Sequence, residues 1–218
     1  MIGYAFMGAA HSHAWRNAHR FFELPFTPEL TAIAGRNRSA VEQAAEQMGW
    51  ASTETDWRAL IERDDIDLID ICTPGNTHAE IAIAALKAGK HVLCEKPLAN
   101  SVAEAEEMTA VAAEAARKGV FAMCGYSYRR TPALALMKRM IAEGKVGTIR
   151  HVRAQYLQDW LSDPHAPLTW RMDKTKSGSG ALGDIGAHSI DAAQFVGPAP
   201  QRRLGHHGNL HEPTPRRR

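Results

Sequence analysis

The chain has 218 residues, of which 44% are hydrophobic and 23% are charged, a composition in the ordinary range of globular proteins that argues against disorder along the whole chain. Its net charge is +2, but residues 197–218 contribute +4 through five arginines and one glutamate, so the remainder carries −2 and a nucleic-acid-binding fold is not indicated. No apolar run approaches the ~20 residues of a membrane helix, and the start lacks the basic segment of a secretory signal, so neither is expected.

Three cysteines, Cys72, Cys94 and Cys124, each lie at the end of a predicted strand. An odd number at wide spacing fits neither a disulfide framework nor a zinc site. We therefore predict reduced thiols that pack in the core of a cytoplasmic protein.

Residues 1–125 alternate between helical patterns and short apolar runs. We predict helices over residues 8–22, 39–48, 57–62, 78–88 and 102–118, with Ser39 as a helix cap, and strands over residues 30–34, 67–72, 91–94 and 120–124. Strands and helices that alternate at this spacing form right-handed crossover units and a parallel sheet. The predicted class is therefore α/β, with a Rossmann-type doubly wound parallel sheet over residues 1–125.

The pattern changes after residue 125. We predict a helix over residues 131–143, a strand with one wet face over residues 149–157, a flexible loop over residues 177–180 and a helix over residues 181–196. This order is typical of the opening of an α+β, open-sheet domain. We interpret residues 126–196 as an incomplete substrate or catalytic domain.

Both ends of the sequence differ from those of a complete doubly wound protein. Only Met1 and Ile2 precede Gly3, where a strand normally leads into the first glycine turn. Residues 197–218 hold four prolines, five arginines and three histidines but few large apolar side chains, so we predict a disordered tail. Truncation at both ends, through a late start codon and a shifted reading frame, is our hypothesis for this pattern.

A glycine turn opens the chain. Residues 3–8 (GYAFMG) have the G-x-G-x-x-G spacing with alanine in the middle position. Such a turn brings backbone close to a pyrophosphate and directs a helix N-terminus at it. An ordinary turn is the alternative, but the strand–helix alternation that follows favours dinucleotide binding.

The segment after the second strand, Gly35-Arg36-Asn37-Arg38, has two guanidinium groups where a ribose-binding carboxylate is common. A 2′-phosphate would suit this charge, so the sequence favours NADP over NAD. The alternative is that Arg36 and Arg38 belong to a solvated loop.

Further motifs follow in a specific order: ICTPGNTH at residues 71–78, Glu95-Lys96-Pro97, GYSYRR at residues 125–130, Trp170-Arg171, and GDIGAH at residues 183–188. Over residues 3–196 this series resembles the Gfo/Idh/MocA family, named for glucose–fructose oxidoreductase and inositol dehydrogenase. The resemblance implies an NAD(P)-dependent oxidoreductase that acts on a sugar, a polyol or a related hydroxy compound. It also implies that substrate and nicotinamide meet between the two domains.

The resemblance carries functional residues onto this chain. Its implied catalytic residues are Lys96, Asp184 and His188. Its implied cofactor-binding residues are Gly3, Ala5, Phe6, Met7, Gly8, Arg36, Thr73, Asn76, His78, Glu95, Lys96, Trp170 and Arg171. Family members continue past the last motif into most of a second-domain sheet, through which they commonly associate. Since that sheet is missing here, homo-oligomerisation and activity of this chain are both left open.

The implied catalytic residues suit hydride transfer. On a helix Asp184 and His188 share one face, and a carboxylate beside an imidazole orients it and raises its basicity. His188 would then accept the proton of a substrate hydroxyl. Lys96 follows a strand at the sheet edge where such folds place ligands, and its ammonium would stabilise the developing alkoxide.

Other functions remain as alternatives. These are a catalytically inactive nucleotide-binding fragment, a dehydratase or glycosidase that uses the cofactor transiently, and nucleic-acid binding by the arginine tail, which is not expected. A metal site is not expected either, because no carboxylate or cysteine completes a plausible shell around His11 and His13 or around the tail histidines His206, His207 and His211.

Overall fold

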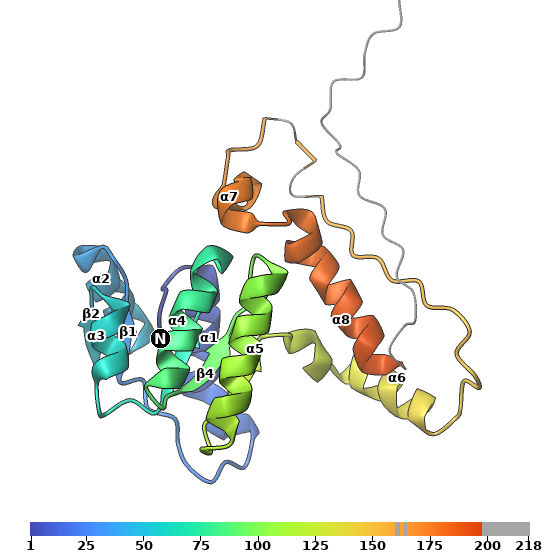
Figure 1. Cartoon of the computed structure of the whole chain (residues 1–218), viewed down its shortest axis with the longest axis horizontal. Coiled ribbons are helices and arrows are strands. Elements are labelled where there is room, and N and C mark those ends of the chain that lie inside the picture. Colours follow the sequence, from blue (N-terminus) through green and yellow to red (C-terminus); the bar gives the residue numbers. More distant parts are fainter. Residues whose placement is uncertain (160–161, 164, 198–218) are drawn as a thin grey trace, which may run out of the picture. The chain divides into compact units, whose positions relative to one another are not determined.

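A computed structural model of the chain describes residues 1–159, 162–163 and 165–197. The predicted disorder of the tail concerns residues that lie, except for Gly197, outside this description. The chain divides into two compact units, Met1–Gly125 and Tyr126–Arg218, each with its own packing. Figure 1 labels the α-helices of both units and some of the strands.

The first unit is built on a parallel sheet. Strand β1 (Ala32–Ala34) pairs with β2 (Ser52–Glu54), while β3 (Leu68–Ile71) pairs with β4 (His91–Cys94) and β4 pairs with β5 (Ala122–Cys124). Every pairing is parallel, so the predicted parallel sheet is confirmed. Strand β2 was not predicted, because Ser-Thr-Glu lacks apolar alternation.

Ile2 joins the two halves of this sheet. It forms parallel bridges to Ala34 on one side and Ile71 on the other. Its N–H donates to the Asp70 carbonyl at 2.8 Å, and its carbonyl accepts the Cys72 N–H at 2.8 Å. The short segment before Gly3 therefore occupies the centre of the sheet, in the place expected for the first strand.

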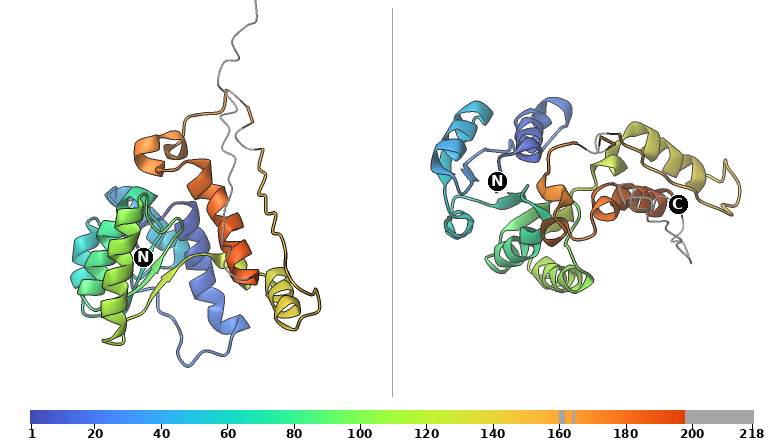
Figure 2. Two further views of the ribbon diagram at one scale, coloured as in Figure 1. Left: turned by 45° about the vertical axis from the view of Figure 1, so that its right-hand side comes forward. Right: turned by 90° about the horizontal axis from the view of Figure 1, so that it is seen from above.

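Helices cover both faces of the sheet. The bounds are α1 (Phe6–Phe21), α2 (Arg38–Met48), α3 (Trp57–Glu62), α4 (His78–Lys87) and α5 (Val102–Ala116). In Figure 2, seen from above, α1 and α2 lie on one side and α3, α4 and α5 on the other. The buried residues correspondingly form two hydrophobic clusters, one around Ile71 and Ile81 and one around Ile33 and Val41. The predicted doubly wound class is therefore confirmed.

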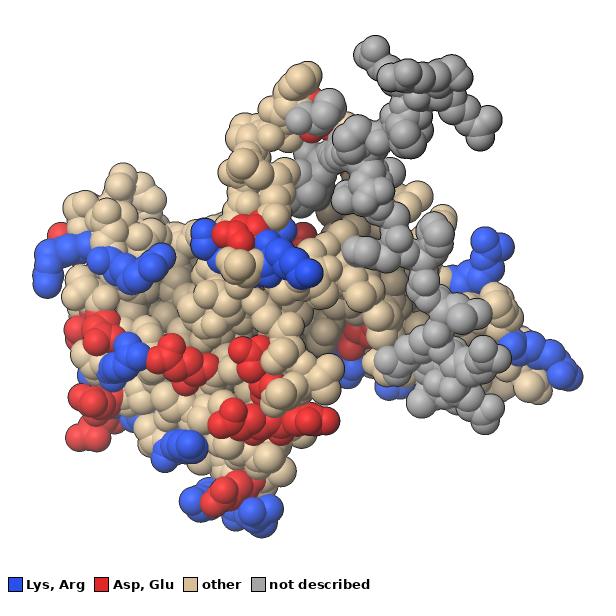
Figure 3. Space-filling view, turned by 45° about the horizontal axis from the view of Figure 1, so that its top comes forward, with Lys and Arg blue, Asp and Glu red and all other residues tan. Residues whose placement is uncertain are grey.

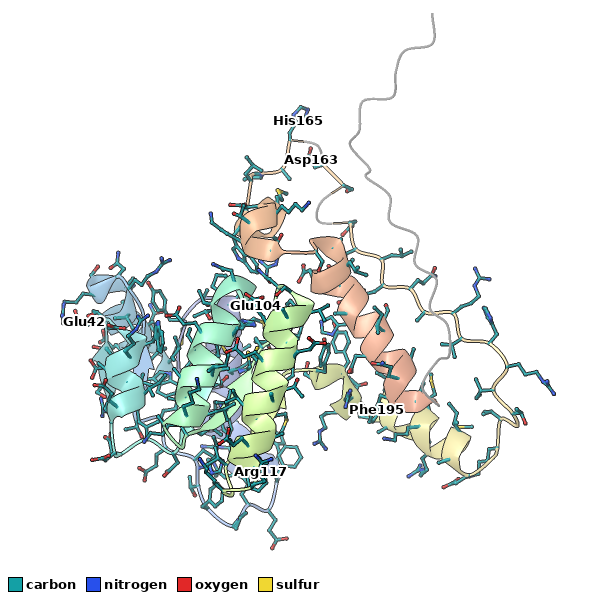
Figure 4. All side chains as sticks on the ribbon, viewed as in Figure 1. Glu42, Glu104, Arg117, Asp163, His165 and Phe195 are labelled. Carbon is teal, nitrogen blue, oxygen red and sulfur yellow. The ribbon has the colours of Figure 1, made fainter. Side chains whose placement is uncertain are left out.

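Local side-chain chemistry sets where two of these helices begin. The Asn37 side chain accepts the Ala40 N–H at 3.1 Å and caps α2, so the prediction of Ser39 as the cap is wrong. The Ser39 hydroxyl instead donates to Asn37 Oδ1 at 3.0 Å. Helix α5 begins with a reciprocal capping box between Ser101 and Glu104, which is labelled in Figure 4.

All three cysteines are present as thiols. Cys72 and Cys94 are buried in the core as predicted, while Cys124 is only partly buried. Burial raises the pKa of the Cys72 thiol to about 11, so this thiol is neutral at pH 7.

In its described residues the second unit is helical. Helix α6 (Pro132–Ala142) packs against α8 (Ala187–Val196), and the short α7 (Lys174–Ser177) lies in the long connection between them. Arg129 binds both carboxylate oxygens of the buried Asp191, at 3.0 and 2.9 Å from its Nε. The Lys138 ammonium lies 4.1 Å from the centroid of the Phe195 ring, which Figure 4 labels on α8.

The predicted strand over residues 149–157 is not formed. A strand needs a hydrogen-bonded neighbour, and no strand of the second unit is present among its described residues. The segment is instead irregular, and Leu157 is 80% exposed. An alternating sequence alone was therefore insufficient to establish a strand.

Charges of both signs are interspersed over the α1–α5 unit on the face shown in Figure 3. The exposed ion pairs of this unit include Arg58 with Glu80 and Arg38 with Glu42. Among the described residues, no helix is both long enough and apolar enough to cross a bilayer.

The central position of Ile2 leads to a first prediction. Its side chain is 3% exposed, so Ile2→Ala should lower the free energy of unfolding by about 3 kcal/mol through lost burial and a residual cavity. The matched change Leu68→Ala, on a strand residue that is 36% exposed, should cost about 1 kcal/mol. Urea denaturation of both variants measures the difference, and equal losses would contradict the central placement of Ile2.

Candidate functional site

The glycine turn brings the start of the chain against the loop that follows β3. Gly3 has a φ of +98°, and a Cβ at this position would lie 2.8 Å from the Cys72 carbonyl oxygen. A Cβ on Gly8 would lie 2.3 Å from the Gly3 carbonyl oxygen. Glycine is thus required at the first and third positions, for a left-handed conformation and for close helix packing.

The N-terminus of α1 opens from this turn. Ala5 is its N-cap residue and has no side-chain oxygen to accept the first N–H groups of the helix. Phe6 is 80% exposed, whereas Met7 packs against the core cluster around Ile33. An uncapped helix N-terminus beside a glycine turn provides the N–H groups and partial positive charge that a phosphate group requires.

The loop after β3 carries the next predicted residues. Thr73 is partly buried, and its hydroxyl accepts a hydrogen bond from the Thr77 hydroxyl at 2.7 Å. Asn76 is exposed in the short turn Gly75–Thr77. Of these two residues, Asn76 has an exposed side chain, whereas the Thr73 hydroxyl is hydrogen-bonded within its own loop.

His78 connects this loop to the loop after β4. Its Nδ1 lies 2.8 Å from the Pro97 carbonyl oxygen and its Nε2 lies 2.9 Å from the Thr73 carbonyl oxygen. These two contacts connect the loops. The His78 side chain is 1% exposed, so it has almost no open surface for a cofactor. Its direct contact with a cofactor stays a prediction.

Lys96 and Glu95 follow β4 at the same edge of the sheet. The Glu95 N–H donates to the Ile71 carbonyl at 2.9 Å, which aligns this loop with the loop after β3. The Glu95 carboxylate is buried, and its Oε2 accepts the Lys96 N–H at 3.0 Å. Lys96 is partly buried and precedes the cis peptide bond to Pro97.

A charged cluster lies beneath this edge. The His11 ring, on α1, has Nδ1 at 3.0 Å from both carboxylate oxygens of Asp70 and Nε2 at 3.0 Å from Oε1 of Glu95. The Trp15 indole N–H donates to Asp70 at 2.7 Å. Asp70 is 2% exposed, so both carboxylates of the cluster are held in the interior.

Burial alone would lower the pKa of His11. Hydrogen bonds with Asp70, Cys72 and Glu95 outweigh that effect and raise the pKa of His11 to about 12. The ring is thus a cation at neutral pH. Ligand-type atoms of His11, Asp70 and Cys72 lie within 4.8 Å of one another, so a carboxylate and a cysteine lie beside His11, which the sequence argument against a metal shell did not anticipate.

Arg36 and Arg38 follow β1. Both side chains are exposed, and Arg38 lies 3.8 Å from Glu42 one helical turn later. This geometry is compatible both with a phosphate contact and with a solvated loop.

In the second unit, Asp184 lies in a π-helical turn, Leu182–Gly186, that leads into α8. Such turns are often found at functional sites. The Asp184 carboxylate lies 3.5 Å from Nε of Arg171, whose guanidinium carbon lies 4.6 Å from the centroid of the Trp170 ring. The structure thus brings together Trp170, Arg171 and Asp184.

His188, one helical turn after Asp184, lies among three tyrosines. Its ring stacks on Tyr128 at a centroid distance of 4.4 Å and lies near the rings of Tyr126 and Tyr156, at 6.2 and 5.9 Å. The hydroxyls of Tyr128 and Tyr156 are 2.7 Å apart, and the Gln158 amide donates to Tyr156 Oη at 3.1 Å.

Sequence reasoning predicted Glu95 and His188 as site residues, but it missed the grouping of Glu95 with His11 and Asp70 and that of His188 with the tyrosines. His11, Asp70 and Glu95 are 59 and 84 positions apart, so only the fold brings them together. Their one available signal was that Asp70 interrupts an otherwise apolar strand. Tyr128 lies within the motif at residues 125–130 but had no assigned role. Tyr156 gave no signal beyond the alternation of residues 149–157.

Comparison with known proteins shows matches along almost the whole chain. Residues 1–126 match the sequence model described as an oxidoreductase family with an NAD-binding Rossmann fold, and residues 134–216 match the GFO/IDH/MocA C-terminal domain. Levoglucosan dehydrogenase from Pseudarthrobacter phenanthrenivorans is 46% identical over 197 residues, which cover 90% of this chain and 50% of the relative. The chain spans about half the length of the curated relatives it matches.

Solved structures agree. An oxidoreductase domain protein from Kribbella flavida is 67% identical with a TM-score of 0.88, covering 89% of this chain and 52% of that one. Levoglucosan dehydrogenase in complex with NADH and levoglucosan is 46% identical with a TM-score of 0.86, with the same coverage of 89% and 52%.

The His11 cluster leads to a prediction about pH. The folded pKa of about 12 exceeds the ordinary value of 6.5, so the stabilisation is fully present below pH 6.5 and is lost as the pH rises towards 12. Unfolding free energy from urea titrations at several pH values should fall over that range, by at most about 1.4 kcal/mol per pH unit from this group. His11→Gln should remove this component, and His13→Gln, an exposed neighbour on α1, should keep it. Identical slopes in the wild type and His11→Gln would contradict the charged bridge.

Proposed function

The chain belongs to the Gfo/Idh/MocA oxidoreductase family, and on this premise we propose that it binds a nicotinamide dinucleotide and contributes to hydride transfer with a sugar, a polyol or a related hydroxy compound. The proposal concerns activity and substrate, because this chain spans about half the length of its relatives. The binding part of the proposal rests on the first unit and the chemical part on residues of both units.

One observation carries the binding part: three loops at the carboxyl edge of the sheet form a connected rim. Gly3 lies against the Cys72 carbonyl, and the Thr73 loop is joined to the Pro97 loop through the two ring nitrogens of His78. Open parallel sheets bind their ligands at this edge. The rim therefore supports a site that holds phosphates at the α1 N-terminus and places Lys96 at its other end.

The reaction chemistry follows from the side chains. When bound, the nicotinamide accepts or supplies the hydride. The Lys96 ammonium stabilises negative charge on the substrate oxygen, and His188 takes the hydroxyl proton as general base. The Asp184 carboxylate lies 3.5 Å from Nε of Arg171, so it orients the Arg171 side chain.

A sugar-like substrate is supported by two features. The relatives levoglucosan dehydrogenase and 1,5-anhydro-D-fructose reductase are 46% and 33% identical to this chain. In addition, His188 is surrounded by Tyr128 and Tyr156, whose hydroxyls can exchange hydrogen bonds with a polyhydroxylated molecule.

The choice between NAD and NADP is the finer part of the proposal. Arg36 and Arg38, with no neighbouring carboxylate in the loop itself, favour NADP. The NADH-bound levoglucosan dehydrogenase supports NAD. We therefore propose that the site accepts both, with Arg36 as the residue that contributes to NADPH affinity.

A second candidate function is nucleotide binding without turnover. It is favoured by the absence of a strand in the described part of the second unit, because catalytic side chains need a rigid support. A dehydratase or glycosidase that uses the cofactor transiently would differ from an oxidoreductase, because its turnover gives no net cofactor reduction.

A cytoplasmic location is proposed because the three cysteines are present as thiols.

The binding and chemical parts separate in one experiment. Calorimetric titration with NADH should show binding, and an absorbance assay with levoglucosan and NAD should show net cofactor reduction. Lys96→Ala should lower kcat by about 10²–10⁴-fold while NADH affinity changes by less than about tenfold. Lys87→Ala, which removes an exposed ammonium from α4, should change neither.

The outcomes decide between the candidate functions. Binding without turnover in the wild type would leave the second candidate, and no binding of either dinucleotide would overturn the proposed function altogether.

The cofactor preference has its own test. Arg36→Ala should weaken NADPH binding by about tenfold, as expected for loss of one charge-assisted hydrogen bond, and NADH binding by less than about twofold. Arg20→Ala, at an exposed position on α1, is the charge-matched control. Equal effects of Arg36→Ala on both dinucleotides would show that Arg36 is only a solvated residue.

A further inference from the structure

Glu95 is the link between the buried cluster and the proposed catalytic lysine. One of its carboxylate oxygens, Oε1, bonds His11 Nε2, and the other, Oε2, accepts the Lys96 N–H, each at 3.0 Å. The backbone that carries Lys96 is therefore two hydrogen bonds away from the His11 ring.

We propose that His11 is a positioning residue for Lys96: its ring fixes the Glu95 carboxylate between α1 and the sheet edge, and Glu95 in turn fixes the turn that presents Lys96. The functional consequence rests on the proposed role of Lys96. The positioning itself rests on geometry within the first unit alone.

The Glu95 carboxylate has little room for another arrangement. It is 6% exposed, and Gly125 lies directly against it, such that a Cβ on Gly125 would be 3.0 Å from Oε1. The Gly125 N–H donates to the Cys94 carbonyl at 2.7 Å, so this neighbour is itself fixed by β4. The orientation of the carboxylate is thus set by its enclosure and by the two groups that donate to it.

His11 is in turn held from its other side. Its Nδ1 faces both oxygens of Asp70, and Asp70 accepts the Trp15 indole N–H at 2.7 Å. Trp15 follows His11 by one turn of α1, so a single helix supplies both groups that hold Asp70. A continuous chain of hydrogen bonds therefore runs from Trp15 through Asp70, His11 and Glu95 to the Lys96 backbone.

This series of hydrogen bonds requires a proton on each ring nitrogen of His11. A neutral imidazole donates from one nitrogen only, which would leave a lone pair facing a carboxylate oxygen, whereas the imidazolium donates from both. The remaining titratable groups near Asp70 are neutral at pH 7, because burial raises the pKa of Cys72 to about 11 and lowers that of the Met1 amino group to about 5. His11 is thus placed between Asp70 and Glu95, where its charge can balance both carboxylates.

Removing the imidazolium should act on Lys96 through Glu95. In His11→Gln the side chain is neutral and its N–H groups lie on one nitrogen, so it cannot replace the imidazolium between the two buried carboxylates, which keep the neutral N–H donors of Trp15 and Lys96. Glu95 or Asp70 then takes up a proton near neutral pH or rotates, and the Lys96 N–H loses its fixed acceptor. A role of His11 in packing alone would change stability without changing the Lys96 amide in this way.

The test is amide and imidazole NMR on the whole 218-residue chain, from about pH 6 to about pH 9. In the wild type both His11 nitrogens should stay protonated and the Lys96 amide should stay constant across this range. In His11→Gln the Lys96 amide should shift with pH, and its hydrogen exchange should accelerate by at least about tenfold. His13→Gln makes the same change at an exposed site on α1 and should leave Lys96 unaffected.

Three results would overturn the proposal. The first is a singly protonated His11 ring in the wild type at pH 7, and the second is an unchanged Lys96 amide in folded His11→Gln. The third is displacement of the His11 proton by equimolar Zn²⁺, since His11, Asp70 and Cys72 would then serve a metal instead. If His11→Gln does not fold, Trp15→Phe removes only the donor to Asp70 and should accelerate Lys96 exchange by a smaller factor.

Kinetics separates this proposal from the proposed function. Where the wild type turns over, His11→Gln should lower kcat by about tenfold with KM for the sugar within about twofold, because orientation of Lys96 and not substrate contact is lost. An unchanged kcat beside a perturbed Lys96 amide would overturn the functional consequence. A wild type that neither binds NADH nor turns over would overturn the proposed function, while the NMR result would still decide the positioning.

Discussion

The parallel pairing of Ile2 with both Ala34 and Ile71 is the constraint on which the rest of the first unit depends. It joins two short sheets into one and directs the chain into the Gly3 turn at the carboxyl edge, beside the Cys72 carbonyl. Helix α1 can begin there only because the turn is tight, and its N-terminus then lies where a phosphate is bound in this fold. A loss of this pairing would separate the glycine turn from the loops after β3 and β4.

The same pairing places a charged cluster under the rim. Asp70 lies on β3 directly beside the Ile2 pairing, and its carbonyl accepts the Ile2 N–H while its carboxylate bonds His11 and Trp15. Two buried carboxylates without a cation would be strongly destabilising, so the imidazolium is a requirement of the arrangement. The same hydrogen bonds hold the Glu95 carboxylate against the Lys96 N–H. Stability and the proposed chemistry are thereby coupled through one histidine.

The sequence predicted the elements of the first unit well, because the signals there are local. Helix α3 and strand β4 have their predicted bounds, and the other predicted helices and strands differ at their ends by one to a few residues. Strand β2 was missed because three polar residues gain their strand character from pairing with β1. The prediction of a strand over residues 149–157 was wrong for the converse reason: the segment has an alternating sequence but no partner strand among the described residues. The His11 cluster could not be predicted, because its members are separated by 59 and 84 positions, and the tyrosines around His188 meet only through packing.

We propose that the rim formed by the loops after Ile2, β3 and β4 binds a nicotinamide dinucleotide. Amide-resolved NMR of the labelled chain during addition of NADH tests it most directly. Binding at the rim should shift the amides of residues 3–8, 73–78 and 95–96, with little change along the outer turns of α5. Shifts confined to other surfaces, or none at saturating NADH, would contradict it.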